Sequence, residues 1–441
     1  MQSTTSHTNR NFSCKEISYQ QLDDFNSSHL QGNFQQSAAM ASVRKQNGTN
    51  VIPLGFFDND DIIGACILEI HGSGLSSFSE IHDGPLLDYH DKDMLAFAFS
   101  ELRKRAKDKG AVQLVITPEI VWQVRNLYGE MLCCENATKE GIPDVANPDK
   151  DELALNNLLD CGFIHEGFTT GYSAVPRWRF IKDLTGITNS NDLLNSFPTS
   201  TKRNNIRIAL DSGIVVRKIA RDDLSEFHRL CEMSSEKQGF DNRDLAFYEL
   251  LFDNFGESAE FDIAYIDTAK QISTWQTKAE KFESEVKKFE EQLASANNKK
   301  RIKKRIIDSK EKLAGALRRV DKAKEYDELG SFIPVACAMF VWHERECVYL
   351  YSGSNPEYNN LYGSNAIQFH AMNECIKRGC KRYNFYGING IFDDKNDPGR
   401  GVLEFKQGFG GYVEEMLGYF EVPLRPAMYR IKKLAHKVLG R

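Results

Sequence analysis

Apolar, β-rich runs alternate with apolar positions at helical spacing through most of this chain. In the first half, the pattern predicts strands at 51–57, 62–70 and 111–116 and helices at 91–108 and 152–159. In the second half, it predicts strands at 213–217, 261–266, 334–342, 347–352 and 382–388 and helices at 221–237 and 364–378. Because the two halves share an order of elements, we expect an α/β (α+β) fold of two tandem units.

A different pattern fills residues 268–329, which contain no Pro and a single Gly. Apolar or small residues step by 3 and 4 along two arms on either side of the polar turn 295–298. The seam consists of Ile272, Trp275, Ala279, Phe282, Val286, Phe289 and Leu293, then Ile302, Ile306, Ser309, Leu313, Ala316, Val320 and Ala323. The pattern predicts an antiparallel coiled-coil hairpin about 40 Å long, inserted in the second unit.

The charge of this hairpin differs from that of the remaining chain. Residues 268–329 hold 17 Lys and Arg against 11 Asp and Glu, although the whole chain has a net charge of −6. Six cations crowd the tip: Lys299, Lys300, Arg301, Lys303, Lys304 and Arg305. The sequence leaves two interpretations open, a solvated helical tip or a contact for the phosphates of a nucleic acid.

Composition excludes several classes of protein. The 441 residues are 41% hydrophobic and 27% charged, which is ordinary globular usage and not that of a disordered or collagen-like chain. The ten cysteines form no C-x-x-C pair, so we expect no metal site among them. The polar N-terminus and the lack of a long apolar run predict a cytoplasmic protein without a spanning helix.

Familiar catalytic signatures, such as a P-loop or a G-x-S-x-G elbow, are absent. Several ordered motifs instead resemble the Fem family of aminoacyl-tRNA-dependent transferases, which build the interpeptide bridge of peptidoglycan. They lie at 33–44, at 197–213 with 238–243, at 349–354, at 403–411 and at 418–423, and the inserted hairpin completes the resemblance.

The resemblance implies two tandem acyltransferase-like (GNAT-type) domains, at 15–175 and at 176–267 with 330–427. The coiled-coil arm would span 268–329 and a basic C-terminal helix 428–441. The implied reaction moves an amino acid from its tRNA to the side-chain amine of the third stem-peptide residue of a peptidoglycan precursor. Lipid II is the preferred acceptor and a UDP-linked muropeptide the alternative, and no metal or other cofactor is expected.

The resemblance also points to individual residues. Arg243 matches the family's phosphate-binding Arg, Arg44 a substrate-binding cation, and Tyr351 a substrate-site Tyr. From the residues alone, Asp241-Asn242 predict a helix cap that would place Arg243 in the first helical turn. The helix dipole disfavours a cation there unless an anion is bound. The alternative for Arg243 is an ordinary surface Arg, and the alternative for Tyr351 is packing in the core.

Phe405 and Lys406 match the family's Phe-Lys pair near the tRNA acceptor end. Lys406 is then expected either to stabilise the oxyanion or to hold the terminal phosphates of the tRNA, and Phe405 to stack on a terminal base. The alternative is a strand-end Lys beside a core Phe. The resemblance fails at Thr117, where relatives often carry an Asp considered as a general base; either Glu119 substitutes or no protein base is needed, and we favour the second.

Three further features stay open. The basic stretch around Lys202 either follows phosphates or is a solvated helix face. The basic, amphipathic C-terminal helix either packs on the body or lies on an anionic inner leaflet. An acetyl-CoA-type N-acyltransferase and a non-enzymatic tRNA-binding protein are the rival functions, although residues 358–365 lack the expected pyrophosphate loop.

Overall fold

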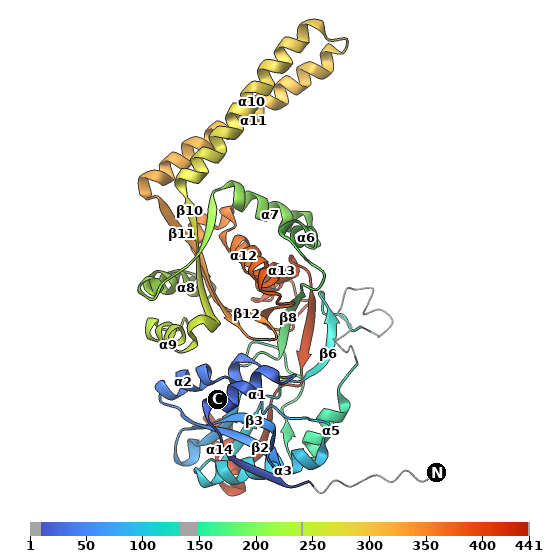
Figure 1. The fold of residues 1–441 in the computed structure, drawn as a ribbon, viewed down its shortest axis with the longest axis vertical. Helices are drawn as coiled ribbons and strands as arrows, with labels where there is room; N and C mark the ends of the chain where they lie inside the picture. The colour runs from blue at the N-terminus through green and yellow to red at the C-terminus, as the bar shows by residue number, and fades with distance from the viewer. Residues whose placement is uncertain (1–9, 133–148, 240, 440–441) are drawn as a thin grey trace, which may run out of the picture.

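The computed structural model describes residues 10–132, 149–239 and 241–439. It contains two mixed β-sheets, each covered by helices, and a long helical arm that projects from the second sheet (Figure 1). The predicted α/β architecture with an inserted coiled coil is therefore confirmed. Phe240 of the motif at 238–243 lies outside the described residues, as do two of the ten cysteines, Cys133 and Cys134.

The first sheet has seven strands in the order β1-β2-β3-β4-β5-β15-β7. The strands are β1 (Phe12–Glu16), β2 (Asn50–Asp58), β3 (Asp61–His71), β4 (Phe78–Ile81), β5 (Gln113–Ile116), β7 (Ile164–His165) and β15 (Phe420–Pro423). Helices α3 (Lys92–Asp108) and α5 (Glu152–Asp160) supply apolar side chains to the core on one face. Helices α1 (Tyr19–Ser28) and α2 (Ala38–Gln46) pack on the other.

The second sheet has eight strands in the order β6-β14-β8-β13-β12-β11-β10-β9. The strands are β6 (Val121–Asn126), β8 (Trp178–Asp183), β9 (Ile214–Lys218), β10 (Ala259–Asp267), β11 (Phe332–Trp342), β12 (Cys347–Ser354), β13 (Arg382–Ile388) and β14 (Tyr412–Met416). One core lies under α6 (Ser190–Asn195), α7 (Ser200–Asp211), α12 (Gly363–Arg378) and α13 (Arg400–Gln407). The other lies under α8 (Leu224–Gln238) and α9 (Leu245–Phe255).

The two sheets exchange strands across the unit boundaries expected from the sequence. Strand β6, from the first half, pairs with β14 at the edge of the second sheet. Strand β15, near the C-terminus, enters the first sheet between β5 and β7. The order of elements along the chain could not indicate these two crossings, because neither strand pairs with its neighbour in sequence.

Residues from the first half also reach into the second core. Met40 and Val43 of α2, and Phe34 of the short 3-10 helix η1 (Phe34–Gln36), pack among the side chains of α8, α9, β10 and β11. The other 3-10 turns are η2 (Gly74–Ser76), η3 (Arg221–Asp223), η4 (Gly256–Ser258) and η5 (Pro356–Leu361). The two sheets are thus joined by shared packing as well as by shared strands.

The arm consists of α10 (Thr268–Ser295) and α11 (Lys299–Leu329), which continue directly from β10 and lead into β11 (Figure 1). Every predicted seam residue is buried or half-buried, and Ala316 and Ala323 have no exposed surface at all. The heptad pattern thus correctly predicted both the helices and their contact face.

The last helix, α14 (Pro426–Leu439), lies against the first sheet (Figure 1). Lys433 is 2.7 Å from Glu421 of β15, and the ammonium of Lys432 lies 5.1 Å from the ring centroid of Phe78. Ile431 and Leu434 nevertheless remain 55% and 64% exposed. None of the described helices combines the length and apolar character needed to cross a membrane.

Candidate functional site

The candidate site lies where strands β12 and β13 separate. These strands are parallel, but they pair only at Cys347 with Tyr383 and at Val348 with Asn384. Beyond that point, β13 is irregular against β8, and Tyr386 has a left-handed backbone with φ of +61°. A bulky residue in this conformation is strained, and such strain is concentrated at functional sites.

Tyr386 contacts residues from both halves of the chain. Its hydroxyl accepts a hydrogen bond from Gln35 Nε2 at 3.3 Å, and its ring lies 5.9 Å from that of Phe34. The guanidinium of Arg179 in β8 is also 5.9 Å from its ring centroid. Burial raises the pKa of Tyr386 far above its ordinary value, so the phenol is neutral and available as a hydrogen-bond donor.

Arg243 and Tyr351 are brought together on one side of this site. The exposed Arg243 guanidinium lies 5.1 Å from the ring centroid of Phe247, and Tyr351 packs edge-to-face on Phe247 at 6.0 Å. Burial raises the pKa of Tyr351, and Arg243 partly opposes this shift. Among the described residues, no carboxylate forms an ion pair with Arg243, and its one side-chain hydrogen-bond partner is the Tyr351 hydroxyl, so an anion could bind here without displacing an ion pair.

The expected position of Arg243 within a helix is wrong. The cap of α9 is Asp244, whose carboxylate accepts a hydrogen bond from the backbone N–H of Phe247. Arg243 therefore precedes the helix instead of lying in its first turn. The sequence contains three residues able to cap, Asp241, Asn242 and Asp244, and the last of them is the one used.

Arg44 is already occupied by protein groups. Its Nη1 lies 2.9 Å from both the Gln35 carbonyl oxygen and Glu69 Oε1, and its Nη2 donates to Gln35 Oε1. Only 11% of its side chain is exposed. In this arrangement, Arg44 holds Gln35 toward Tyr386, and a phosphate would have to displace these partners.

A buried ionic cluster fixes the contact between the sheets. Arg179 donates to Glu119 at 2.6 Å and to Asp83 at 2.7 Å. Burial raises the pKa of Asp83, which Arg179 opposes. The hydroxyl of Thr117 accepts from the backbone N–H of Asp83 at 2.9 Å. Glu119, the alternative general base, is thus held by Arg179, and Thr117 supports a backbone turn.

Lys406 reaches the same strand from the opposite side. Both Phe405 and Lys406 lie in helix α13, so the alternative of a strand-end Lys is wrong. Lys406 is buried, and its Nζ donates to the Gly387 carbonyl at 2.6 Å, next to Tyr386. Burial lowers the pKa of Lys406 to about 7, and no nearby carboxylate opposes the shift.

A second buried amine lies beside Phe405. Lys202 donates to Asn365 Oδ1 at 2.8 Å and to the Phe405 carbonyl at 3.1 Å. Burial lowers its pKa to about 8. Phe405 and Asn365 line a cavity of about 190 Å³ at the N-terminus of α12. Lys202 therefore does not lie on a solvated helix face, which was one of the two interpretations of this basic stretch.

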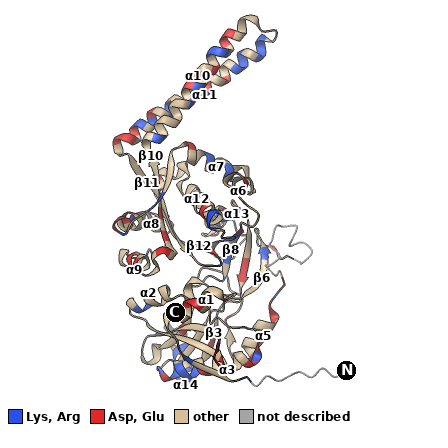
Figure 2. Cartoon of the chain, viewed as in Figure 1, with Lys and Arg blue, Asp and Glu red and all other residues tan. Residues whose placement is uncertain are grey.

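The tip of the arm is separate from this site. All six predicted tip cations are exposed, and among the described residues none of them forms an ion pair with a carboxylate. Figure 2 shows Lys and Arg near the free end of the arm, away from the two sheets. Lys299, Lys300 and Arg301 occupy the first turn of α11, where the helix dipole disfavours cations unless an anion is bound.

The structure thus brings Arg243 and Tyr351 together on one face of the second sheet, whereas Phe405 and Lys406 lie on its other face. Arg44 lies behind Gln35, and the tip cations lie apart. Tyr386, which was not predicted from the sequence, has a strained backbone and contacts with both halves of the chain, and neither has a local sequence signal.

Comparisons with known proteins identify the family of this chain. The model of the FemAB family matches residues 17–437, and the chain belongs to this family. The aminoacyltransferase FemA of Staphylococcus epidermidis is 27% identical over 97% of this chain and 99% of its own length. FemA of Staphylococcus aureus strain MRSA252 is 25% identical over 87% of this chain and 88% of its own.

The fold has a solved counterpart. A crystal structure of FemX superposes with a TM-score of 0.77 at 23% identity, covering 95% of this chain and 99% of that one. The family expected from the sequence motifs is confirmed, and the chain is an aminoacyltransferase.

Proposed function

We propose that this enzyme transfers an amino acid from aminoacyl-tRNA to the side-chain amine of the third stem-peptide residue of lipid II, forming the interpeptide bridge of peptidoglycan. Family membership supports aminoacyl transfer. The observation that carries the finer proposal is the exposed Arg243 guanidinium beside Tyr351 of β12, together with the buried Lys406 amine bonded to Gly387 of the neighbouring strand β13. Arg243 supplies a cation for an anionic acceptor, and Lys406 supplies an amine for the reacting ester.

The reaction needs alignment more than a strong base. The acceptor amine attacks the ester carbonyl, a C–N bond forms, and the C–O bond to the ribose breaks. The proton that the amine loses passes to the departing ribose oxygen or to water. Both carboxylate oxygens of Glu119 accept hydrogen bonds from Arg179 within the buried cluster, so Glu119 is not free to reach the acceptor amine, which supports a reaction without a protein base.

Lys406 is assigned to the transfer step. In its protonated form it would stabilise the oxyanion of the tetrahedral intermediate, while Phe405 would stack on the terminal base of the tRNA. We expect Lys406→Met to lower the single-turnover rate on the order of a hundredfold, as loss of one oxyanion donor does. Thr117→Ala should change it by only a small factor, and a slower Thr117→Ala enzyme would contradict this assignment.

The acceptor's diphosphate is assigned to Arg243, because an Arg fork binds phosphate oxygens through two hydrogen bonds. A separate observation, on helix α14, favours lipid II over a nucleotide-linked acceptor. Helix α14 exposes Ile431 and Leu434 next to Arg430 and Lys433, a combination that suits the surface of an anionic leaflet. The tRNA backbone is assigned to the six tip cations.

A competition between acceptors tests this proposal. The purified enzyme is given charged tRNA and equal concentrations of lipid II and a UDP-linked muropeptide, and both products are quantified by mass spectrometry. We expect the amino acid predominantly on lipid II, attached to the third-residue side chain. Preferential modification of the nucleotide-linked acceptor would reject lipid II, and attachment elsewhere would reject the proposed amine.

A further inference from the structure

A buried carboxylate in the second sheet lacks any hydrogen-bond partner. Asp262 lies in β10 and is only 1% exposed, and neither of its carboxylate oxygens has a hydrogen bond among the described residues. An ionised carboxylate buried without a partner is far more costly than an ordinary unmade hydrogen bond. This side chain therefore indicates that a further group belongs at this position.

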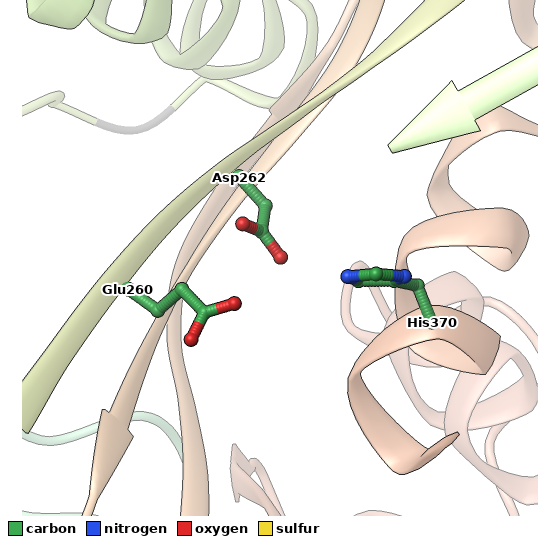
Figure 3. Close-up of side chains that lie close together, drawn as sticks. All are labelled: Glu260, Asp262 and His370. Atoms are coloured by element: carbon green, nitrogen blue, oxygen red, sulfur yellow. The ribbon is translucent and has the colours of Figure 1, made fainter. Parts of the chain in front are cut away.

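Two other metal-ligating side chains face Asp262. Glu260 precedes it by two residues and so points to the same face of β10, while His370 approaches from helix α12 (Figure 3). Each of the three offers a ligand atom, and these atoms all lie within 4.8 Å of one another. Ligands around a tetrahedral metal at about 2.1 Å are roughly 3.4 Å apart, so small side-chain rotations bring all three into range.

The charge balance of this cluster favours a cation. Arg378 donates to Glu260 Oε2 at 2.7 Å, whereas both oxygens of Asp262 lack a hydrogen-bond donor among the described residues. Lys218, on the neighbouring strand β9, also makes no hydrogen bond to either oxygen of Asp262.

We propose that Glu260, Asp262 and His370 form a binding site for a divalent transition metal, with Zn²⁺ as the best match. One imidazole with two carboxylates suits Zn²⁺, whereas Mg²⁺ and Ca²⁺ prefer oxygen ligands alone. Glu374 follows His370 by one helical turn and acts electrostatically on both His370 and Asp262. Because Glu374 pairs with Lys377 at 2.6 Å, a water molecule would complete the coordination.

Such an ion ties helix α12 to the sheet. The same helix begins at Gly363, beside the cavity lined by Phe405 and Asn365. A metal bound between β10 and α12 would therefore fix the position of the cavity wall without entering the reaction. This role makes binding and stability, not catalysis, the appropriate measurements.

The test is calorimetric titration of Zn²⁺ into the full chain after treatment with EDTA and desalting. We expect one saturable site, and Asp262→Asn and His370→Gln should each weaken binding more than about 100-fold, because even outer-shell changes cost 10–100-fold. His228→Gln is the matched control: His228 and Glu232 also stand at i and i+4 on a helix, 4.0 Å apart, without buried carboxylates beside them.

Circular dichroism establishes that each variant is folded. Unchanged Zn²⁺ binding by both folded variants, or no saturable binding by the parent chain, would overturn the proposal. Equal loss of binding in His228→Gln would overturn it as well, because the titration would then report surface histidines.

Discussion

Replacing Lys406 by Met should change how the stability of this enzyme depends on pH. Lys406 has a folded-state pKa of about 7, well below the value of about 10.4 expected in the unfolded chain. Between these two values the unfolded state binds more protons than the folded state. The free energy of unfolding of the parent protein therefore rises with pH across this window, and the burial penalty is largest below pH 7.

The size of the effect follows from the same two values. Between pH 7 and pH 9.5, this one amine should add about 3 kcal/mol to the free energy of unfolding of the parent protein. The Met variant lacks this contribution at every pH. It also leaves the Gly387 carbonyl without its donor, which costs about 1–3 kcal/mol independently of pH.

Urea unfolding of both proteins at several pH values between 6.5 and 9.5 measures the difference. We expect Lys406→Met to be the more stable protein, or nearly equal, at pH 6.5 and to lose that advantage by pH 9.5. Lys104→Met, at an exposed position of α3, is the control and should run parallel to the parent. If the Lys406→Met profile also runs parallel, then Lys406 is not a desolvated amine and the reasoning fails.

Three other variants test separate parts of the structure. Arg243→Ala should raise the acceptor KM about 10- to 150-fold, from a loss of about 1.5–3 kcal/mol, with little change in the KM for aminoacyl-tRNA. Arg243→Lys should recover only part of the acceptor affinity, and equal effects on both substrates would contradict the assignment. Replacing the six tip cations by Glu should weaken tRNA binding and flatten its salt dependence in filter-binding titrations, whereas unchanged affinity would leave the arm without a role in tRNA binding. Arg179→Met should destabilise the protein by about 3–5 kcal/mol in urea, because Asp83 and Glu119 remain buried without their cation; a loss below 1 kcal/mol would show that the cluster does not hold the sheets together.

The sequence predicted those parts of the fold whose determinants are local. The coiled-coil arm is the clearest case, because each heptad contacts only the neighbouring helix and the seam is complete within 268–329. Strand pairing between distant segments was not predictable in this way. Strands β6 and β15 each join the sheet that the order of elements does not suggest.

The sequence pointed to several residues near the candidate site, but it missed Tyr386 and could not give the geometry. The Phe-Lys pair at 405–406 was found through its family resemblance, yet the buried amine and its bond to Gly387 required the fold. Arg44 carries the expected positive charge, but its partners Gln35 and Glu69 became visible only in three dimensions. His370 lies more than a hundred residues from Asp262, so no local pattern joins them.

Transfer of an amino acid from tRNA is the central claim, and one measurement tests it directly. The purified enzyme is incubated with lipid II and bulk charged tRNA, and the lipid II product is analysed by mass spectrometry, with uncharged tRNA and acetyl-CoA in parallel reactions. We expect the mass of lipid II to increase by an aminoacyl residue only with charged tRNA. An acetyl increment from acetyl-CoA, or tRNA binding without any increment, would contradict it.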